Sequence, residues 1–306
     1  MKKNEVFIVA GPTASGKTSL AIKLAKKFAR EVINADSLQV YKENKILSAQ
    51  PSVEEKANIP HHLFGYVNGN EEYHVARWLE DVVPKINDIN CGSILVGGTG
   101  FYLKHLIFGL SSIPDIPMDI RQETRQLFEE LGAVNFYKAL KDVDPLAASK
   151  LDKHNGHKTM RAYEVIKATN RSILEWQQEN KIYFPISSFK VIILLPDREK
   201  LYENCNQRFL SMLDQGAIDE VQYLMSKNYN MSSGIMKSHG APELRDYLLE
   251  TCSLKNSIER SQQVVRNYAK RQITWFKHQF NHVELKKYFV QDSEHQAKEI
   301  IEFLES

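Results

Sequence analysis

The chain has 306 residues, 42% of them hydrophobic and 25% charged, and its formal net charge at pH 7 is +2, so it can bury one large core or two smaller ones. No apolar run approaches the roughly 20 residues of a membrane-spanning helix, and the first ten residues lack a signal-peptide pattern. Its three cysteines have no C-x-x-C spacing, which argues against a zinc site or a disulfide framework. We therefore expect a cytoplasmic protein with no membrane partner.

The first motif in the chain is a phosphate-binding loop. Residues 11–18 read GPTASGKT and fit the pattern G-x-x-x-x-G-K-[ST], between a strand-like EVFIVA and an amphipathic SLAIKLAKKFA. Gly11 and Gly16 allow backbone conformations in which successive N–H groups point at phosphate oxygens. Lys17 adds a positive charge, and Thr18 offers a hydroxyl to Mg²⁺. The motif predicts a phosphorylated ligand but does not say which one.

Strand and helix patterns alternate through the first third of the chain. EVINAD and GSILVGGTG are strand-like, and HVARWLEDVVPKIND between them is typical of a helix. From about Pro114 the pattern is helical with polar breaks, until FKVIILLPD returns to a strand. Strands separated by helices indicate a parallel sheet covered on both faces. We predict an α/β fold, a P-loop NTPase-like core formed by residues 1–115 and 186–306, interrupted by a helical insert over 116–185.

Two polar stretches follow predicted strands. Asp36 of INADSLQVY ends the second strand, and Thr99 lies in the glycine-rich ILVGGTGFYLK. The carboxyl ends of parallel strands line the ligand crevice, so Asp36 is expected near Thr18. A helix cap or a turn is the alternative for Asp36, and a tight turn is the alternative for the glycines. Asp197 also follows an apolar strand, but the preceding Pro196 makes it the weaker metal candidate.

A basic and aromatic segment lies near the end of the chain. It reads RSQQVVRNYAKRQITWFKHQF and contains Arg260, Arg266, Lys270, Arg271 and Lys277 together with Trp275 and Phe276. On a helix, residues four apart such as Arg266 and Lys270 share a face. Two interpretations remain open: a solvated helix whose aromatic residues pack inward, or a surface that contacts RNA phosphates.

A set of short stretches resembles one enzyme family. GPTASGKT, INADSLQVY, PHHL, LVGGTGFYLK, MRAYEV, QRFLSMLDQGAIDEV and YAKRQITWFKHQF occur in the order and spacing of the tRNA dimethylallyltransferases, also called tRNA isopentenyltransferases. The match covers nearly the whole chain. It implies transfer of a dimethylallyl group from dimethylallyl diphosphate to the exocyclic amine of the adenosine 3′ of the anticodon. The loop at residues 11–18, which resembles an ATP-binding site, would then hold an isoprenoid diphosphate.

The resemblance also implies roles for individual residues. Asp36 would be the catalytic base, and Thr18 would hold Mg²⁺. The diphosphate would bind Gly11, Thr13, Ala14, Ser15, Gly16, Lys17, Thr18 and Arg208. The anticodon stem-loop of tRNA would contact Asp36, Ser37, Leu38, Gln39, Thr99, Arg121, His157, Lys158, Thr159, Met160, Arg161, Lys237, Ser238, His239, Gly240, Ala241 and Pro242. We expect the enzyme to act as a monomer.

Two other classes of protein share a phosphate loop. A kinase for a nucleotide or small metabolite would need ATP turnover and a pocket for an acceptor hydroxyl. A nucleotide-dependent RNA-binding switch would change its RNA affinity on hydrolysis without forming a covalent product. Transfer of a labelled dimethylallyl group into tRNA without ATP distinguishes the transferase from both.

Overall fold

A computed structural model describes residues 5–230, 233–280, 285–288 and 294–306. The chain forms two compact units, one made of Met1–Ile107 with Phe184–Ser306 and the other of Phe108–Tyr183. The second unit begins eight residues before the expected insert, at 108 instead of 116, and ends at 183 instead of 185. Across the described ranges, every helix is too short or too polar to span a lipid bilayer.

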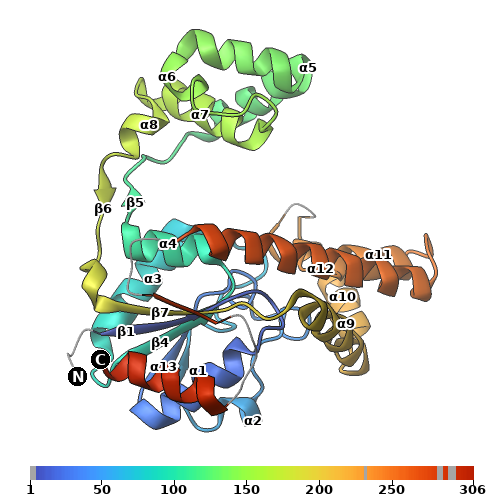
Figure 1. Cartoon of the computed structure of the whole chain (residues 1–306). Coiled ribbons are helices and arrows are strands. Elements are labelled where there is room, and N and C mark those ends of the chain that lie inside the picture. Colours follow the sequence, from blue (N-terminus) through green and yellow to red (C-terminus); the bar gives the residue numbers. More distant parts are fainter. Residues whose placement is uncertain (1–4, 231–232, 281–284, 289–293) are drawn as a thin grey trace. The chain divides into compact units, whose positions relative to one another are not determined.

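The first unit is built on a parallel sheet of six strands (Figure 1). The strands are β1 (Val6–Ala10), β2 (Glu31–Asn34), β3 (His61–His62), β4 (Ser93–Gly97), β7 (Phe189–Leu194) and β8 (Leu285–Tyr288), in the spatial order β3-β2-β4-β1-β7-β8. Every pairing is parallel. All residues of β1, β4 and β7 are buried, as expected for strands covered on both faces. The predicted parallel α/β core is therefore confirmed.

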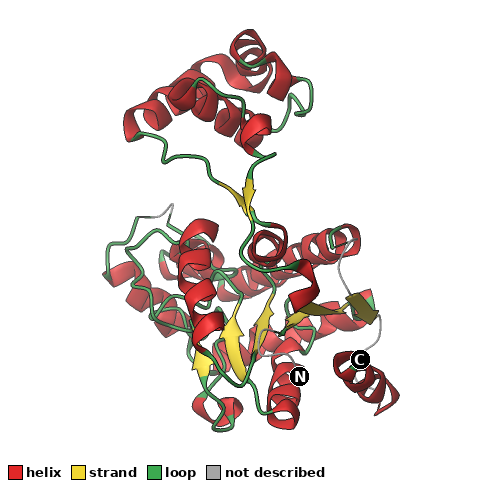
Figure 2. Ribbon diagram, turned by 90° about the vertical axis from the view of Figure 1, so that its left-hand side faces the viewer, coloured by secondary structure: helices red, strands yellow, loops and turns green. Residues whose placement is uncertain are grey.

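Helices cover both faces of this sheet (Figures 1 and 2). On one face lie α1 (Lys17–Phe28), the short α2 (Val53–Lys56) and α13 (Glu294–Glu305); on the other lie α3 (Val75–Asp88) and α4 (Gly100–Phe108). Leu24 of α1 and Phe303 of α13 belong to one apolar cluster with Phe7 and Ile192 of the strands. The helices predicted from SLAIKLAKKFA (19–29) and HVARWLEDVVPKIND (74–88) thus form, as α1 and α3, where apolar residues recur on one face.

A layer of helices follows β7. It contains a short 3₁₀ turn (Ile186–Ser188), α9 (Arg198–Asp214), α10 (Ala217–Ser226), a second 3₁₀ turn (Ile235–Lys237), α11 (Ala241–Leu248) and α12 (Leu254–His278). Phe209 and Met212 of α9 pack with Val221 of α10, Leu244 of α11 and Leu47 of an earlier loop. This packing brings α9 to the edge of the sheet where the phosphate loop lies.

The second unit is mainly helical. Its helices are α5 (Met118–Val143), α6 (Pro145–Ala148), α7 (Gly156–Thr169) and α8 (Ile173–Trp176), and its two short strands, β5 (Leu110–Ser111) and β6 (Asn180–Lys181), pair antiparallel. Leu140, Ala147 and Ala162 form its core. Gly132 interrupts α5 with a φ of 67°, so two helical pieces meet there at a kink.

Candidate functional site

The phosphate loop connects β1 to α1 and depends on unusual backbone angles. Gly11 has a φ of 149°, and a Cβ there would lie 2.4 Å from the carbonyl oxygen of Leu194. Gly16 has a φ of 84° at the N-cap of α1, and Ala14 a φ of 59°. Only glycine fits the first position without strain. The loop therefore presents the open N-terminus of a long helix, a geometry suited to anions.

Two helices that are distant in sequence contact Thr13, the first residue of this loop with a hydroxyl group. The backbone N–H of Thr13 donates to Oε1 of Gln272 on α12 at 2.8 Å, and the hydroxyl of Thr13 accepts from Nη2 of Arg208 on α9. Nε2 of Gln272 donates in turn to the carbonyl of Gly98 at 2.9 Å. A Cβ on Gly98 would lie 2.4 Å from that nitrogen. Gln272 thus joins the phosphate loop to the glycine turn after β4, a role no sequence pattern indicated.

Two cations face the loop. Nζ of Lys17 donates to the carbonyl of Pro12 at 2.7 Å. Burial lowers the pKa of Lys17 to about 8; nearby Asp36 opposes that shift, and Arg208 adds to it. Burial also lowers the pKa of Arg208. Each group would regain favourable charge interactions if an anion entered the loop, because an anion offsets the cost of burying a cation.

A cavity of about 1030 Å³ opens in front of the loop. Thr13 to Ser19 line it, together with Asp36, Gln39 and Arg208. Thr18 and Asp36 therefore share one cavity, as the positions of their strand ends predicted. In the described part of the chain, no group of three or more histidine, cysteine or carboxylate side chains could hold a metal ion alone. A Mg²⁺ ion would need phosphate oxygens beside the hydroxyl of Thr18, the usual arrangement for this metal.

Asp36 lies in a tight turn after β2. Its Oδ1 accepts from the backbone N–H of Leu38 at 3.0 Å, and no helix begins there. The helix-cap alternative for Asp36 is therefore wrong. The turn alternative is correct for one of its two carboxylate oxygens, Oδ1, which accepts a hydrogen bond within the turn. The next residue, Ser37, donates its N–H to Oγ1 of Thr99 at 3.0 Å. A Cβ on Gly98 would lie 3.6 Å from the other oxygen, Oδ2. The predicted stretches after β2 and β4 are thus in direct contact.

Asp197 has a different place. Its side chain caps α9 by accepting from the backbone N–H groups of Glu199 and Lys200, and the residue is exposed. It does not line either cavity that contains Asp36. Of the two acidic candidates from the sequence, only Asp36 reaches the phosphate loop.

A second, smaller cavity of about 40 Å³ adjoins Asp36, Thr13 and Arg208. Its remaining walls are mostly apolar and come from Leu38, Leu47, Ser48, Cys205, Phe209, Met212, His239, Val265 and Tyr268. The rings of His239 and Tyr268 lie 3.9 Å apart between centroids, with an interplanar angle of 42°. Burial lowers the pKa of His239 to about 4, so its imidazole is neutral at pH 7. Asp36 and Arg208 thus line both cavities.

Several residues assigned to tRNA by resemblance hold loops together. Nε2 of Gln39 donates to the carbonyls of Ser48 and Ala49 at 2.9 and 2.8 Å. The buried hydroxyl of Ser238 accepts from Nδ2 of Asn44 at 2.6 Å. Ala241 is also buried, and with Pro242 it forms the first turn of α11, after Gly240 with a φ of 98°. Lys237 is exposed. The side chain of Lys237 is therefore more accessible to RNA than the buried side chains of Ser238 and Ala241.

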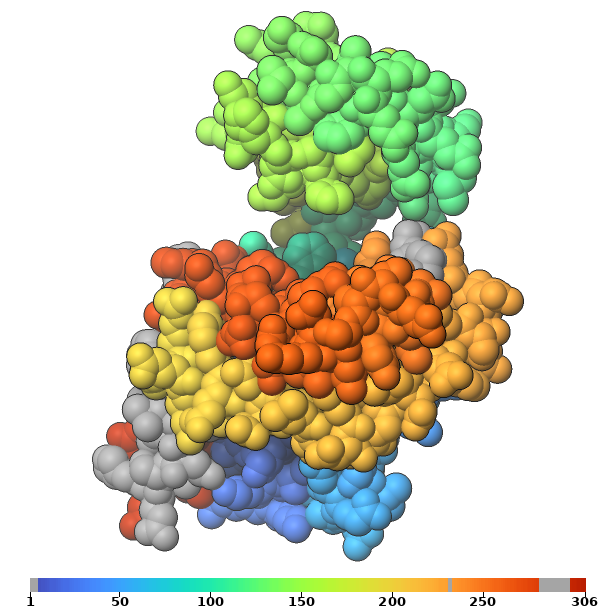
Figure 3. Space-filling view, turned by 90° about the vertical axis from the view of Figure 1, so that its right-hand side faces the viewer, coloured from blue at the N-terminus to red at the C-terminus, as the bar shows by residue number. Residues whose placement is uncertain are grey.

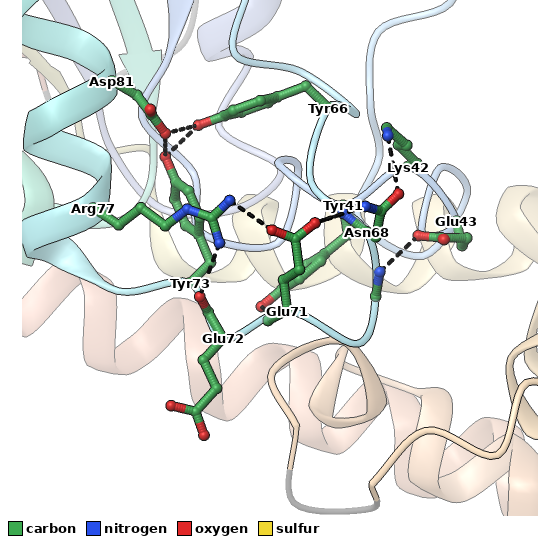
Figure 4. Close-up of polar contacts among 11 residues, drawn as sticks. Tyr41, Lys42, Glu43, Tyr66, Asn68, Glu71, Glu72, Tyr73, Arg77 and Asp81 are labelled. Atoms are coloured by element: carbon green, nitrogen blue, oxygen red, sulfur yellow. Dashed lines mark hydrogen bonds and ion pairs between the residues drawn. The ribbon is translucent and has the colours of Figure 1, made fainter.

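A polar network braces the segment between β2 and α3 (Figure 4). The hydroxyls of Tyr66 and Tyr73 both donate to Oδ2 of Asp81, at 2.5 and 2.9 Å, and Arg77 pairs with Glu71 at 2.7 Å. Burial raises the pKa of both tyrosines. Because these groups are supplied by α3 and by the loop itself, the loop after Asp36 is tied to the helix that covers the sheet.

The remaining predicted tRNA residues lie in the second unit. Arg121 is on α5, and residues 157–161 form the first turns of α7. His157 and Lys158 are exposed, and Arg161 pairs with Glu164 at 3.4 Å. Thr159 is fully buried, with its hydroxyl bonded to backbone carbonyls of its own turn. The Thr159 side chain therefore supports the first turn of α7, and a contact of this residue with tRNA stays a prediction.

The basic segment forms α12, which lies at the surface (Figure 3). Arg260 pairs with Asp246 at 3.0 Å, and Arg266 donates to Oδ1 of Asn206 at 2.6 Å. A groove of about 560 Å³ runs along the helix and is lined by Asn267, Lys270, Arg271, Thr274, Trp275, His278 and Gln279. Phe276 is buried. Phe276 thus packs inward, as the first interpretation predicts, while two cations and a tryptophan line an open groove. Contact of this surface with RNA stays a prediction.

Known proteins resemble the chain over most of its length. A family described as IPP transferase matches residues 39–279, and one described as isopentenyl transferase matches residues 4–64. The tRNA dimethylallyltransferase of Ehrlichia chaffeensis is 42% identical over 281 residues, covering 90% of this chain and 92% of that protein. That of Rickettsia bellii is 41% identical over 283 residues, covering 91% and 90%.

Solved structures agree with this match. The tRNA isopentenylpyrophosphate transferase of Bacillus halodurans superposes with a TM-score of 0.71 at 30% identity, covering 99% of this chain and 96% of that one. A eukaryotic dimethylallyltransferase, captured in crystallographic snapshots of its action on tRNA, gives a TM-score of 0.83 at 28% identity, covering 97% and 77%. By sequence and by fold, the chain belongs to the IPP transferase family, whose members include the tRNA dimethylallyltransferases.

Proposed function

We propose that this protein transfers a dimethylallyl group from dimethylallyl diphosphate to the exocyclic amine of the adenosine 3′ of the anticodon in tRNA. The observation that carries this proposal is the shared cavity of the phosphate loop and Asp36. The phosphate loop with Lys17 and Arg208 is suited to bind a diphosphate, and the carboxylate of Asp36 beside them is suited to accept a proton. The names of the curated relatives support the same reaction.

The departing pyrophosphate would be held by the loop amides, Lys17 and Arg208. As the carbon–oxygen bond of the donor breaks, negative charge grows on the diphosphate, and fixed cations stabilise that charge. The buried positions of Lys17 and Arg208 strengthen this effect, because charges interact more strongly away from water. Thr18 would help to hold Mg²⁺, which would add positive charge at the same place.

Asp36 would accept the proton of the acceptor amine. The amine nitrogen forms a bond to the allylic carbon, pyrophosphate leaves with the electrons of the broken bond, and one amine proton passes to the carboxylate. An amine conjugated with a purine ring is a weak nucleophile, so a base within hydrogen-bond reach favours this step. Oδ1 is engaged by Leu38, which leaves Oδ2 for the proton. The adenine must leave the stack of the anticodon loop to reach it.

The groove of α12 is the proposed contact surface for the RNA in the first unit. Lys270 and Arg271 would neutralise phosphates, and the neighbouring Trp275 would offer a face for a base. In the second unit, the exposed His157 and Lys158 would serve the same partner. We further propose that the enzyme acts as a cytoplasmic monomer, in keeping with the family resemblance.

The test is an incubation of the protein with labelled dimethylallyl diphosphate, Mg²⁺ and an unmodified tRNA transcript, without ATP. We expect label in the tRNA and an equal amount of released pyrophosphate. A matched transcript with guanosine in place of the adenosine 3′ of the anticodon should remain unlabelled. Brisk ATP hydrolysis without labelled tRNA would overturn the proposal and favour a kinase or an RNA-binding switch.

A further inference from the structure

The buried side chain of Asn34 surrounds the backbone of the proposed base. Its Oδ1 accepts from the N–H of Asp36 at 2.8 Å, and its Nδ2 donates to the carbonyl of Asp36 at 2.9 Å. The same Nδ2 donates its second hydrogen to the carbonyl of Leu63 at 3.0 Å. Asn34 has no exposed surface. One amide therefore binds both backbone polar groups of Asp36 and links them to the loop after β3.

From these contacts we propose that Asn34 is a positioning residue that fixes the orientation of the Asp36 carboxylate toward the acceptor amine. This inference rests on the proposed role of Asp36. Asp36 lies two positions past the end of β2, beyond the last residue that pairs with β4. In place of a strand partner, the side chain of Asn34 supplies one acceptor and one donor.

Few side chains of this size could make the same contacts. The amide has one oxygen that accepts and two N–H groups that donate, and all three are used here. An ionised aspartate would lack both donors, serine has one donor on a shorter side chain, and leucine has neither. The amide is thus matched to the three backbone groups that it binds.

Leu63 provides a second, independent observation. Its φ of 61° is in the left-handed region, which bulky residues rarely adopt. Its carbonyl accepts the second hydrogen of the Asn34 amide. The backbone of Asn34 is held as well, because the buried indole N–H of Trp78 donates to its carbonyl at 3.0 Å. Strained residues persist where the surroundings determine them fully, and they gather at functional sites.

The hydrogen bonds between the Asn34 amide and the Asp36 backbone determine which carboxylate oxygen of Asp36 can accept the proton of the amine. Since Leu38 occupies Oδ1, the turn can present Oδ2 to substrate only while the backbone of Asp36 keeps its orientation. Asn34 lines neither cavity that contains Asp36. Its loss should therefore affect the chemical step and leave the binding of the donor unchanged.

The experiment compares Asn34→Ala with wild type in single-turnover transfer at saturating tRNA and donor. We expect the rate to fall about 10- to 100-fold, because small displacements of a catalytic group have effects of this size. The donor KM and the tRNA Kd should stay within about twofold. Ser257→Ala is the control for loss of a buried polar side chain: it removes a buried bond from side chain to backbone, at 2.8 Å to the carbonyl of Glu243, far along the chain from Asp36.

A double-mutant cycle with Asp36→Asn separates positioning from a general loss of structure. If Asn34 acts through the carboxylate, Asn34→Ala should have almost no further effect on the rate in the Asp36→Asn background. Additive losses, or a folded Asn34→Ala variant with the wild-type rate, would overturn the proposal. A normal rate for Asp36→Asn alone would instead remove Asp36 from the mechanism, which is a failure of the proposed function.

Asn34→Ala could fail to fold, and a second variant covers that outcome. Leu63→Gly keeps the carbonyl that Asn34 binds and relieves the left-handed strain, since glycine adopts a positive φ freely. The same cycle is then measured with Asn34→Ala in the Leu63→Gly background. Loss of folding there too would contradict the proposal, because the amide would be supporting the fold and not the orientation of the carboxylate.

Discussion

The loop after β1 and the turn after β2 lie at the same edge of the sheet but are built in different ways. The phosphate loop takes its shape mainly from its own glycines and from the start of α1. The turn that carries Asp36 takes its shape from side-chain bonds, made by Asn34 two residues before Asp36 and by Thr99 after β4. The backbone of the phosphate loop can therefore form from a local motif, to which Gln272 and Arg208 add contacts from distant helices. The proposed acceptor turn is instead held by side-chain bonds to its backbone.

This difference has a functional consequence. Substitutions in the phosphate loop should mainly affect the diphosphate, because its amides and cations face that ligand. Substitutions around the turn should mainly affect proton removal and leave the diphosphate in place.

The largest effect is expected for Asp36→Asn. The amide keeps the size of the side chain and an oxygen that can accept from Leu38, but it removes the basic electron pair. Single-turnover transfer should fall by about 10²- to 10⁴-fold, the usual contribution of a general base. Donor binding should change little. Near-normal transfer by a variant with a normal melting curve would show that Asp36 has only a structural role in the turn.

Lys17→Ala and Arg208→Ala should lower kcat/KM for the donor by about 10²- to 10³-fold, since each removes a cation from the departing diphosphate. The affinity for tRNA, measured by filter binding, should remain close to wild type. An equal loss of tRNA affinity would contradict the separation of donor and acceptor regions.

The pH dependence of donor use should reflect Lys17. Its lowered pKa of about 8 means that the ammonium is charged below this pH and becomes neutral above it. The kcat/KM for the donor should therefore decline as the pH rises through about 8, by up to about tenfold per pH unit. Lys17→Arg serves as the control, because a guanidinium stays charged and should remove this part of the decline. If kcat/KM declined equally with pH in wild type and in Lys17→Arg, the decline would belong to a group other than Lys17.

The smallest effect concerns the groove of α12. Lys270→Gln should weaken the binding of all tRNAs alike. It should also reduce the magnitude of the slope of log K, the association constant for tRNA, against log salt concentration by about one unit. Lys255→Gln is the matched control, since Lys255 is an exposed cation at the start of the same helix and outside the groove. We expect its slope to equal that of wild type. Equal slopes for all three proteins would leave α12 as a solvated face.

Much of the first unit could be predicted from the sequence. The glycine pattern at 11–18 and the mainly apolar strands identify the loop and the parallel sheet, because both signals are local. The order of strand ends correctly brought Thr18 and Asp36 to one cavity. The family resemblance added Arg208, which meets Thr13 although the two lie far apart in sequence.

Other features had no local signal. The amide of Gln272 reaches both the phosphate loop and Gly98, and the left-handed Leu63 serves Asn34, but neither pairing follows from spacing along the chain. The limits of the second unit were also displaced, because β5 and β6 have two residues each and are too short to show a period. The burial of Thr159 depends on the packing of α7, which motif matching does not describe.

In the proposed reaction, the phosphate loop accepts an isoprenoid diphosphate and not a nucleoside triphosphate. The most direct test is competition: labelled dimethylallyl diphosphate is bound to the wild-type protein with Mg²⁺, and unlabelled pyrophosphate or ATP is then added. We predict that pyrophosphate displaces the label at lower concentration than ATP, and that Lys17→Ala binds the label poorly. Displacement by ATP at lower concentration than pyrophosphate, with donor binding unchanged in Lys17→Ala, would contradict the account.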